Sequence, residues 1–312
     1  MIQISLDKFN SLPSLRSMNP VFARHETFHP RFGWIKKGFD AAQQSSGVFL
    51  QEDAPVRLGV GKNMANSIRY WCNAFKVLKE DIPSEFGDRL LGDNGWDSFL
   101  EDPTSLWLLH WKLLQPPCNA TAWYFAFNIF HKVEFSQEEL FDALCDYRDS
   151  VAPRIAPSSL KKDISCILRM YVEQAAKVNI SEDSLDCPFT ELGIIHTAGD
   201  SRHYTFRIGS KGNLPAEIIV FACLEYASWV GREQRTISVS RLLYDTCSPG
   251  MVFKLSENAI CSAIEQVAKH FNSINLTDSA GLIQFEYFDE PEKLADELLE
   301  KYYSSRRNRA KR

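Results

Sequence analysis

Two neighbouring segments, residues 104–114 and 119–133, are apolar and aromatic on almost every side, and they constrain the fold more than any other feature of this chain. A helix of this composition has no polar face to turn toward water, so it must be buried all round. A chain of 312 residues that is 45% hydrophobic can supply the necessary cover. We therefore expect a globular, mainly helical protein with these two helices in its core.

A helix with two distinct faces is predicted within residues 54–79, where residues of one kind recur at spacings of three and four. The apolar face holds Met64, Ile68, Trp71, Phe75 and Leu78. The face predicted to point away from the core holds Lys62, Asn66, Arg69, Asn73 and Lys76, with Asn63 beside it. No Asp or Glu occurs in this segment, and Arg and Asn suit base edges and phosphates. A DNA-reading helix is the favoured interpretation, and a merely solvated face is the alternative.

The sign of the charge reverses in residues 80–102, which hold eight acids and the single Arg89. Asp93-Asn94-Gly95 is typical of a hairpin turn, and short apolar runs at 86–91 and 96–100 flank it. A basic helix followed by a small hairpin is the order of elements in a winged helix-turn-helix. We therefore predict a winged-helix domain near the N-terminus.

The rest of the chain predicts a helical middle and a second winged-helix-like unit. Ser136 and Glu139 form a capping box that starts one helix, and a long helix begins at Ser158. Polar residues at 179–188 mark a domain boundary. Beyond them we expect strands at 189–195, 204–208 and 282–288, and helices at 215–230, 238–244 and 256–271. Arg202 and Lys211, in an acid-free loop, are further candidates for DNA contact.

The expected fold is mainly α with small antiparallel β wings, in which winged helix-turn-helix domains at both ends are joined by a helical middle. The expected domains are residues 1–135, 136–182 and 183–312. Residues 1–20 are predicted to be a loosely ordered lead-in. An acidic helix at 291–303 leads to a basic tail, which is predicted to be disordered because it has no apolar anchor.

Residues 22–38 form the densest concentration of chemically capable side chains. The runs His25-Glu26-Thr27-Phe28, Arg31-Phe32-Gly33-Trp34 and Lys36-Lys37-Gly38 resemble the opening of a bacterial family of unknown function. Members of that family are encoded beside sulfurtransferase-like enzymes in DNA phosphorothioation gene clusters. Further blocks at residues 58–64, 68–71 and 102–111 agree, and the resemblance extends over nearly the whole chain.

The resemblance implies a DNA-binding and DNA-nicking component of a single-strand phosphorothioation system used in phage defence. Its implied partners are DNA and the sulfurtransferase-like and ATPase components of the same system. A non-catalytic subunit that recognises DNA and recruits those partners is the alternative. His25 and Glu26 are the candidate catalytic residues, because they pair a proton-transfer group with a carboxylate. Candidate DNA contacts in the same segment are Arg24, Arg31, Lys36 and Lys37.

Two cofactor motifs are excluded on local grounds. His25 to His29 matches H-E-x-x-H, but Pro30 disfavours helical geometry at the second His, so we reject a zinc protease site. Gly59-Val60-Gly61-Lys62-Asn63 lacks the first glycine of a phosphate loop and its Ser or Thr, so no nucleotide or organic cofactor is expected.

A DNA-nicking enzyme would require carboxylates that hold Mg²⁺ or Mn²⁺. No acid stands two residues before a Lys, so the common nuclease signature is missing. Asp93, Asp97 and Asp102 are the candidate ligands of such a site. Whether His25 and Glu26 serve catalysis or a buried polar network that fixes the domain stays open at this point.

The overall charge and the cysteines limit the remaining possibilities. A formal net charge of -5 means that any DNA contact must come from local segregation of charge. Eight Cys without a C-x-x-C pair indicate buried thiols rather than a zinc or disulfide framework. The sequence lacks a leader or an apolar run long enough to cross a bilayer, so we expect a cytoplasmic protein that does not bind a membrane. A homodimer remains open.

Overall fold

The computed structural model describes residues 19–173, 187–199, 202–231, 234–279 and 281–310. The described chain is mainly helical, with three small antiparallel sheets, as the sequence predicts. The expected lead-in before residue 19 and the expected boundary at residues 182 and 183 lie outside the described residues.

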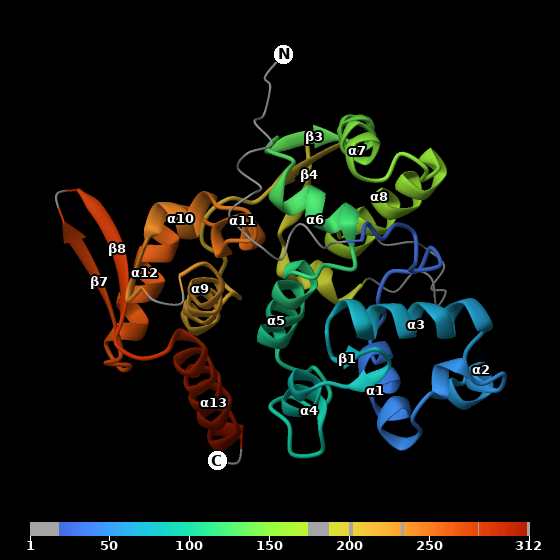
Figure 1. Ribbon diagram of the computed structural model, residues 1–312, viewed down its shortest axis with the longest axis horizontal. Coiled ribbons are helices and arrows are strands. Elements are labelled where there is room, and N and C mark those ends of the chain that lie inside the picture. Colours follow the sequence, from blue (N-terminus) through green and yellow to red (C-terminus); the bar gives the residue numbers. More distant parts are fainter. Residues whose placement is uncertain (1–18, 174–186, 200–201, 232–233, 280, 311–312) are drawn as a thin grey trace.

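Helices α5 (Pro103–Leu114) and α6 (Thr121–Asn128) form the centre of the fold, between α1–α4 on one side and α9–α13 on the other (Figure 1). All eight residues of α6 are buried, and so are ten of the twelve residues of α5. The prediction of two buried helices is confirmed. The second helix is shorter than expected, because the chain turns after Asn128 to enter strand β3 (Glu134–Ser136).

The N-terminal group, residues 34–91, consists of short helices that pack on one another, with a single two-stranded sheet. Its elements are α1 (Trp34–Gln44), η3 (Val48–Leu50), α2 (Ala54–Leu58), α3 (Lys62–Ala74), β1 (Leu78–Lys79), β2 (Ile82–Pro83) and α4 (Glu85–Leu91). Helix α1 crosses α3 at Gly38, where an added Cβ would lie 2.5 Å from Cys72 Sγ. Ile68, Trp71, Phe75 and Leu78 are buried and Met64 is partly buried, so the predicted apolar face of α3 is confirmed.

The predicted hairpin around Asp93-Asn94-Gly95 is wrong. Residues 86–91 belong to helix α4, because the Ser84 side chain caps it by accepting from the N–H of Gly87. The described chain forms no strand over residues 96–100. The only pairing near this region is that of β1 with β2, two residues each, immediately after α3.

The middle of the chain forms a unit in which a short strand is followed by two helices and an antiparallel hairpin. Its elements are β3, α7 (Gln137–Val151), α8 (Pro157–Tyr171), η5 (Pro188–Leu192), β4 (Ile195–Ala198) and β5 (His203–Phe206). The sheet order is β3-β5-β4. The capping box of Ser136 and Glu139 is confirmed at the start of α7. The strand expected at 189–195 is instead a 3-10 turn followed by β4, which begins at Ile195.

The C-terminal part repeats this order of elements. Its elements are α9 (Ala216–Val230), β6 (Thr236–Ser238), α10 (Val239–Tyr244), α11 (Pro249–Phe253), α12 (Glu257–Ala268), β7 (Ile274–Ser279) and β8 (Leu282–Tyr287). The sheet order is β6-β8-β7, so in both units the first strand pairs with the last. Because β3 pairs with β5, one sheet joins segments that the sequence assigns to different predicted domains.

Helix α13 (Pro291–Ala310) packs on α9 and reaches back to the N-terminal group (Figure 1). Tyr303 stacks on Trp96 at 5.3 Å between ring centroids, and Arg306 pairs with Asp102 at 2.5 Å. The helix continues through Ala310, so the prediction of a disordered tail is wrong for residues 304–310. None of the described helices is both long and apolar enough to cross a membrane. All eight Cys are free thiols, six of them buried, as predicted.

Candidate functional site

A cleft of about 660 Å³ lies between residues 21–26, the polar face of α3 and the turn between β1 and β2. It brings together candidates that are far apart in the sequence. Its lining residues are Val21, Arg24, Glu26, Asn66, Arg69, Tyr70, Asn73, Glu80, Asp81 and Asn119. Five of the predicted site residues, namely Arg24, Glu26, Asn66, Arg69 and Asn73, therefore meet in this one cleft.

The loop that forms one wall of the cleft is held in a strained conformation. Ala23, Glu26 and Thr27 have φ of 54°, 50° and 67°, in the left-handed region that residues with a side chain seldom occupy. Such strain persists only when surrounding contacts enforce it, and it is concentrated at functional sites. The Trp71 indole N–H donates to the carbonyl of Phe28 at 3.0 Å, so α3 is one of the elements that fix the loop.

His25 does not enter the cleft. Its ring is fully buried, and its Nε2 lies 2.8 Å from Asp163 Oδ1 on α8. The ring packs against Trp71 and Trp123, with centroids 6.2 Å and 5.6 Å away. Its neighbours Arg24 and Glu26 are exposed on the cleft side. Of the two interpretations left open by the sequence, the buried polar network fits His25, and Glu26 is the member of the pair that solvent can reach.

Asp163 is the partner that sequence reasoning missed. Both of its carboxylate oxygens accept from the backbone N–H of Ala23, at 2.9 Å and 3.1 Å. Burial raises the pKa of the Asp163 carboxyl, whereas the hydrogen bond from His25 lowers it. The available signal was positional, since Asp163 is the one acid within α8 and lies among the buried Leu160, Ile164 and Ile167. An acid in a core position requires a partner.

The polar face of α3 is less free than its sequence suggests. Arg69 donates from Nε and Nη2 to Asp81, at 2.9 Å and 2.6 Å. The Asn73 amide also donates to Asp81, at 2.9 Å. Asp81 stands only a few residues beyond the acid-free segment, and the tight β1–β2 turn folds it back onto α3. In the folded chain, the C-terminal half of the acid-free polar face is therefore paired with an acid, Asp81.

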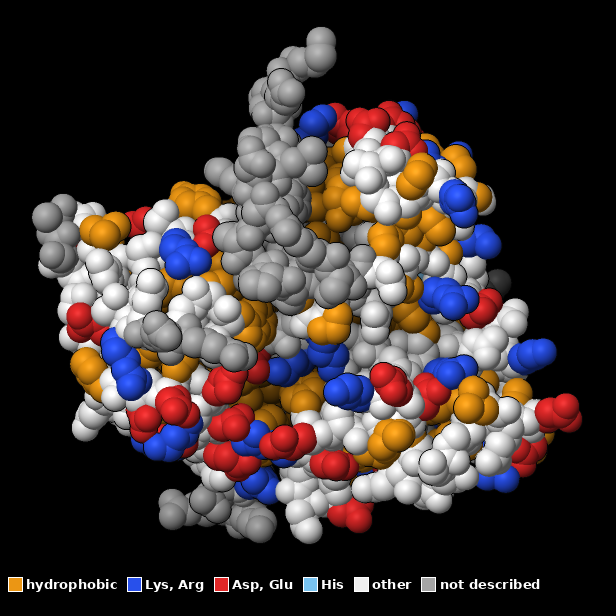
Figure 2. Space-filling model, viewed as in Figure 1, with side chains coloured by type: hydrophobic (Ala, Val, Ile, Leu, Met, Phe, Trp, Pro, Cys, Tyr) orange, Lys and Arg blue, Asp and Glu red, His pale blue; other side chains and the backbone are white. Residues whose placement is uncertain are grey.

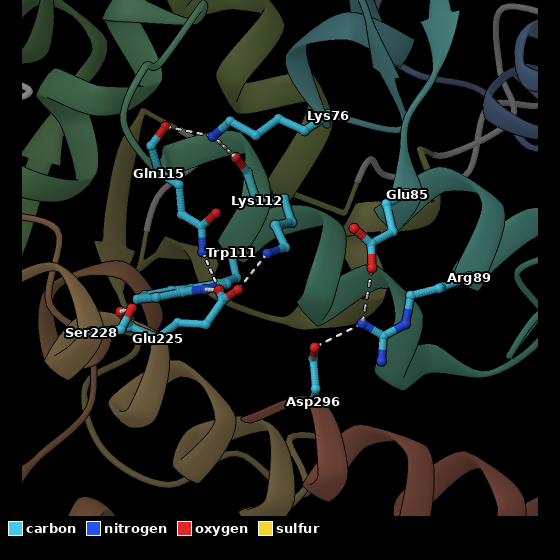
Figure 3. Close-up of polar contacts among 9 residues, drawn as sticks. All are labelled: Lys76, Glu85, Arg89, Trp111, Lys112, Gln115, Glu225, Ser228 and Asp296. Carbon is cyan, nitrogen blue, oxygen red and sulfur yellow. Dashed lines mark hydrogen bonds and ion pairs between the residues drawn. The ribbon is translucent and has the colours of Figure 1, made fainter. Parts of the chain in front are cut away.

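Two predicted DNA contacts are turned inward. Lys76 Nζ donates to the carbonyls of Lys112 and Gln115 at 2.7 Å and 2.6 Å (Figure 3). Lys211 Nζ donates to the carbonyls of Gly209 and Lys254 at 2.8 Å and 2.9 Å. Burial lowers the pKa of both ammonium groups to about 7. The prediction that Lys76 faces away from the core is wrong, because its residue has left the helix with a φ of 60°.

The remaining predicted cations lie outside the cleft. Lys36 is engaged by Asp40 at 2.7 Å and by the Leu91 carbonyl, and Lys37 donates to the Leu58 carbonyl at 3.1 Å. The Arg31 guanidinium lies 5.2 Å from the ring centroid of Trp34. Lys62 and Asn63 are exposed at the start of α3, and Lys62 lines a neighbouring hollow of about 450 Å³ that shares Asn66 with the cleft. Arg202 is exposed in the turn directly before β5.

Two of the predicted metal ligands, Asp97 and Asp102, do not fit a magnesium or manganese site, and the third, Asp93, is exposed in the turn after α4. Asp97 accepts from Ser105 Oγ at 2.6 Å and from the N–H groups of Glu101 and Asp102. Asp102 caps α5 and pairs with Arg306. Both carboxylates thus accept hydrogen bonds from the local backbone and do not converge on one point. A magnesium or manganese ion requires several oxygen ligands at once. Among the residues that the structure describes, no group of three or more His, Cys, Asp or Glu could hold a metal ion.

A second polar cluster joins α5 to α9 and was not predicted. The Glu225 carboxylate accepts from the Trp111 indole at 2.7 Å, from Lys112 Nζ at 2.7 Å and from the Gln115 amide (Figure 3). A cavity of about 290 Å³ lies beside it, between α4, α5, α9 and α13. Three donors, one of them a cation, compensate this carboxylate, which explains how a charge is accommodated next to the apolar α5. The cluster therefore accounts for packing between helices.

Comparison with known proteins gives one family and closely similar folds. The model of DUF4007, described as a protein of unknown function, matches residues 22–303. A structure described as "SspB crystal structure" is 36% identical, with a TM-score of 0.86 over 92% of this chain and 89% of that chain. A structure described as "Magnesium ion-bound SspB crystal structure" is also 36% identical, with a TM-score of 0.86 over 94% and 90% of the two chains.

No curated protein matches. The family model begins at Phe22, the first residue of the densest segment, and covers every block on which the resemblance was based. The suspected relationship is thereby confirmed. The chain belongs to the DUF4007 family.

Proposed function

We propose that this protein binds DNA as an SspB-type component of a DNA phosphorothioation system. The observation that carries the proposal is the convergence of Arg24, Asn66, Arg69 and Asn73 on one cleft, walled by the strained loop at residues 23–27. Arg and Asn are the side chains best suited to phosphates and to purine edges. The 36% identity to SspB structures supports a role in the same system.

The cleft is suited to local contact with a backbone rather than to general electrostatic attraction. Asp81 holds the Arg69 guanidinium in a fixed orientation, which lowers the entropy lost when it binds a phosphate. Glu26, Glu80 and Asp81 also line the cleft, so it is not uniformly positive. Lys62 extends the cationic surface past Asn66 toward the start of α3, where backbone N–H groups favour anions.

The order of elements supports winged-helix units in this protein. In the middle and C-terminal units a strand, two or three helices and a hairpin follow one another, and the first strand pairs with the last. Helices α2 and α3, which follow one another across Gly59, are also followed by a short hairpin, the β1–β2 pair, although no strand of the described chain precedes them. We infer that the chain uses winged helix-turn-helix units to contact DNA, alongside sulfur-transfer and ATPase partners.

Nicking of DNA by this chain is the second candidate function. The observation that favours it is Glu26, an exposed carboxylate in a strained conformation in the same cleft as Arg24. A carboxylate beside a cation suits proton transfer near a phosphate. If the chain only recognises DNA, the strain at Glu26 serves to shape the cleft.

Both functions can be tested on one set of variants. The wild type should bind duplex DNA, and Arg24→Ala combined with Lys62→Ala should lower the salt slope of the binding constant by about two, since each lost phosphate contact releases about one fewer counterion. Lys293→Ala, which removes an exposed paired cation on α13, is the control and should have little effect. Absence of duplex binding by the wild type would refute the proposal.

The nicking activity is measured on supercoiled plasmid with Mg²⁺ or Mn²⁺ present. If Glu26 takes part in the chemistry, Glu26→Gln should abolish the conversion to open circles while leaving DNA affinity and the melting temperature nearly unchanged. If the wild type leaves the plasmid intact while binding it, the protein is a recognition subunit.

A further inference from the structure

Helix α8 presents a solvent face that is basic along its whole length. The exposed side chains on this face and in the turn before it are Arg154, Ser158, Lys161, Lys162, Ser165 and Arg169. Their spacings of three and four place them on one side of the helix. Within Pro157–Tyr171 the single acid, Asp163, is buried against His25 on the opposite side. The surface of α8 therefore carries cations and hydroxyls with no acid among them.

The charge of this unit is segregated between its two helices. The exposed face of α7 holds Glu138, Asp142, Asp146 and Asp149, whereas every charged side chain exposed on α8 is a cation. On the face of the molecule drawn in Figure 2, acidic side chains gather at the top, over α7, and basic ones line the edge beside α8. A folded unit that merely needed solubility would have no reason to separate the signs in this way.

The equivalent helix of the C-terminal unit lacks this charge. Helix α12 is the last α-helix before the hairpin of its unit, as α8 is in the middle unit, where η5 also precedes the hairpin. Its exposed side chains are Glu257, Asn258, Ser262, Glu265 and Gln266, and exposed Lys269 follows as its C-cap. The position in the fold therefore does not by itself require a basic face. The basic face belongs to α8 in particular.

We propose that α8 binds duplex DNA, with Lys161, Lys162 and Arg169 on the phosphates that border one groove and Ser158 and Ser165 facing it. From Lys161 to Arg169 the helix rises about 12 Å, which matches the width of the major groove. Helix α8 is the last α-helix before the β4–β5 hairpin, in the place of the recognition helix of a winged-helix unit, and exposed Arg202 stands directly before β5 in the turn of that hairpin. This assignment rests on the proposed DNA binding and names a surface for it that is separate from the cleft beside α3.

The buried side of α8 connects this surface to the cleft. Asp163 accepts from Ala23 and contacts His25, the two residues that flank Arg24 in the strained loop. DNA seated on α8 would therefore rest on a helix that also fixes the cleft loop. The two surfaces should act on one duplex rather than on independent ligands.

The test compares α8 with α12 in the full-length chain. Lys161→Gln, Lys162→Gln and Arg169→Gln are combined in one variant, and Lys269→Gln on α12 is the matched control. Binding to a labelled duplex is measured by fluorescence anisotropy across a salt series, and thermal melting checks the fold. We expect the α8 variant to bind about 10- to 100-fold more weakly near physiological salt, with a salt slope lower by about two to three. The control should bind like the wild type.

Each outcome decides the assignment. If the wild type binds the duplex while the α8 variant retains both affinity and slope, the assignment to α8 falls and the proposed function stands. If the wild type does not bind duplex DNA at all, both fall. If the α8 variant melts at a lower temperature, Lys161→Arg with Lys162→Arg is measured in addition, and restored affinity supports the phosphate contacts whereas a persistent loss overturns them.

Discussion

The middle unit and the C-terminal unit share one order of elements and one sheet order, yet their equivalent helices differ on both faces. On the solvent side, α8 is basic and α12 carries Glu257 and Glu265. On the buried side, α12 packs only apolar residues such as Ile260 and Ile264, whereas α8 holds Asp163 against the N-terminal loop. The order of elements therefore determines how the helices and the sheet of each unit pack. The side chains on the two faces of its last helix determine which other parts or ligands the unit contacts.

Two lysines join these units to each other. Lys254, just before α12, donates from Nζ to the carbonyl of Phe127 in α6, and its ammonium lies 4.6 Å from the ring centroid of Phe206 in β5. Lys211, between β5 and α9, donates to the carbonyl of Lys254. Lys211 and Lys254 therefore connect the two units and do not form a basic surface.

The largest effect is expected from breaking the contact that distinguishes the buried side of α8. Asp163→Ala leaves the His25 ring and the Ala23 N–H buried without an acceptor, so the free energy of unfolding should fall by about 2–4 kcal/mol. The matched change on α12, Ile264→Val, should cost only about 1 kcal/mol. Denaturant unfolding monitored by circular dichroism measures both. Equal losses in the two helices would mean that the Asp163 network adds nothing beyond ordinary core packing.

Much of the fold follows from periodicity in the sequence. The apolar faces of α3 and α12, the buried α5 and α6, and the Ser136 capping box were all predictable because each is encoded by the residue pattern of a single segment. The hairpin at Asp93 was not, because Ser84 caps a helix there and turn chemistry alone cannot reveal a competing cap. Local patterns thus indicate elements better than they indicate what joins them.

The candidate site depended on contacts that no local pattern reports. The convergence of Arg24 and Glu26 with Arg69 could not be anticipated from a local pattern, since a loop and a helix far apart in the sequence supply the three. Asp81 and Asp163 were missed as partners because the β1–β2 turn brings one to α3 and α8 brings the other to His25. Lys76 and Lys211 were misassigned because a basic side chain in a polar stretch can still be used to satisfy buried carbonyls.

A smaller effect, dependent on pH, should reveal the lysines between the two units. Burial lowers the pKa of Lys254 from 10.5 to about 7. Between these values the unfolded chain binds more protons than the folded one, so the free energy of unfolding should rise with pH, by up to about 1.4 kcal/mol per pH unit for one lysine. The range from pH 7 to 8.5 separates the effect of the buried lysines from that of the thiols. The thiols ordinarily titrate near pH 9, and buried Cys223 and Cys247, with raised pKa values, would oppose the rise of stability above it.

Lys254→Met should lower the slope of stability with pH by the contribution of one lysine, because Lys76 and Lys211, whose pKa values are also lowered to about 7, still contribute. Lys293→Met, at an exposed position on α13, should leave the slope as in the wild type. Unfolding by denaturant at several pH values within that range gives both slopes. Identical slopes in all three proteins would show that Lys254 stays charged in the folded state, and the ion would then have to be offset by its contacts with Phe127 and Phe206.

The smallest effect on stability is expected where the end of α13 contacts the N-terminal group. Removing residues 306–312 deletes the Arg306–Asp102 ion pair and the hydrogen bond from Arg307 to the Asn94 carbonyl at 3.2 Å. Because the Arg306 side chain is half exposed, the free energy of unfolding should fall by no more than about 1 kcal/mol. Arg306→Gln and Asp102→Asn, alone and together, separate this ion pair from the capping role of Asp102 at α5. Additive losses in that cycle would mean that the ion pair contributes nothing. If truncation lowers the free energy of unfolding by well over about 1 kcal/mol, the last turns of α13 help to hold the C-terminal unit in place. The C-terminal unit would then depend on a contact with the N-terminal group, as the middle unit does through Asp163.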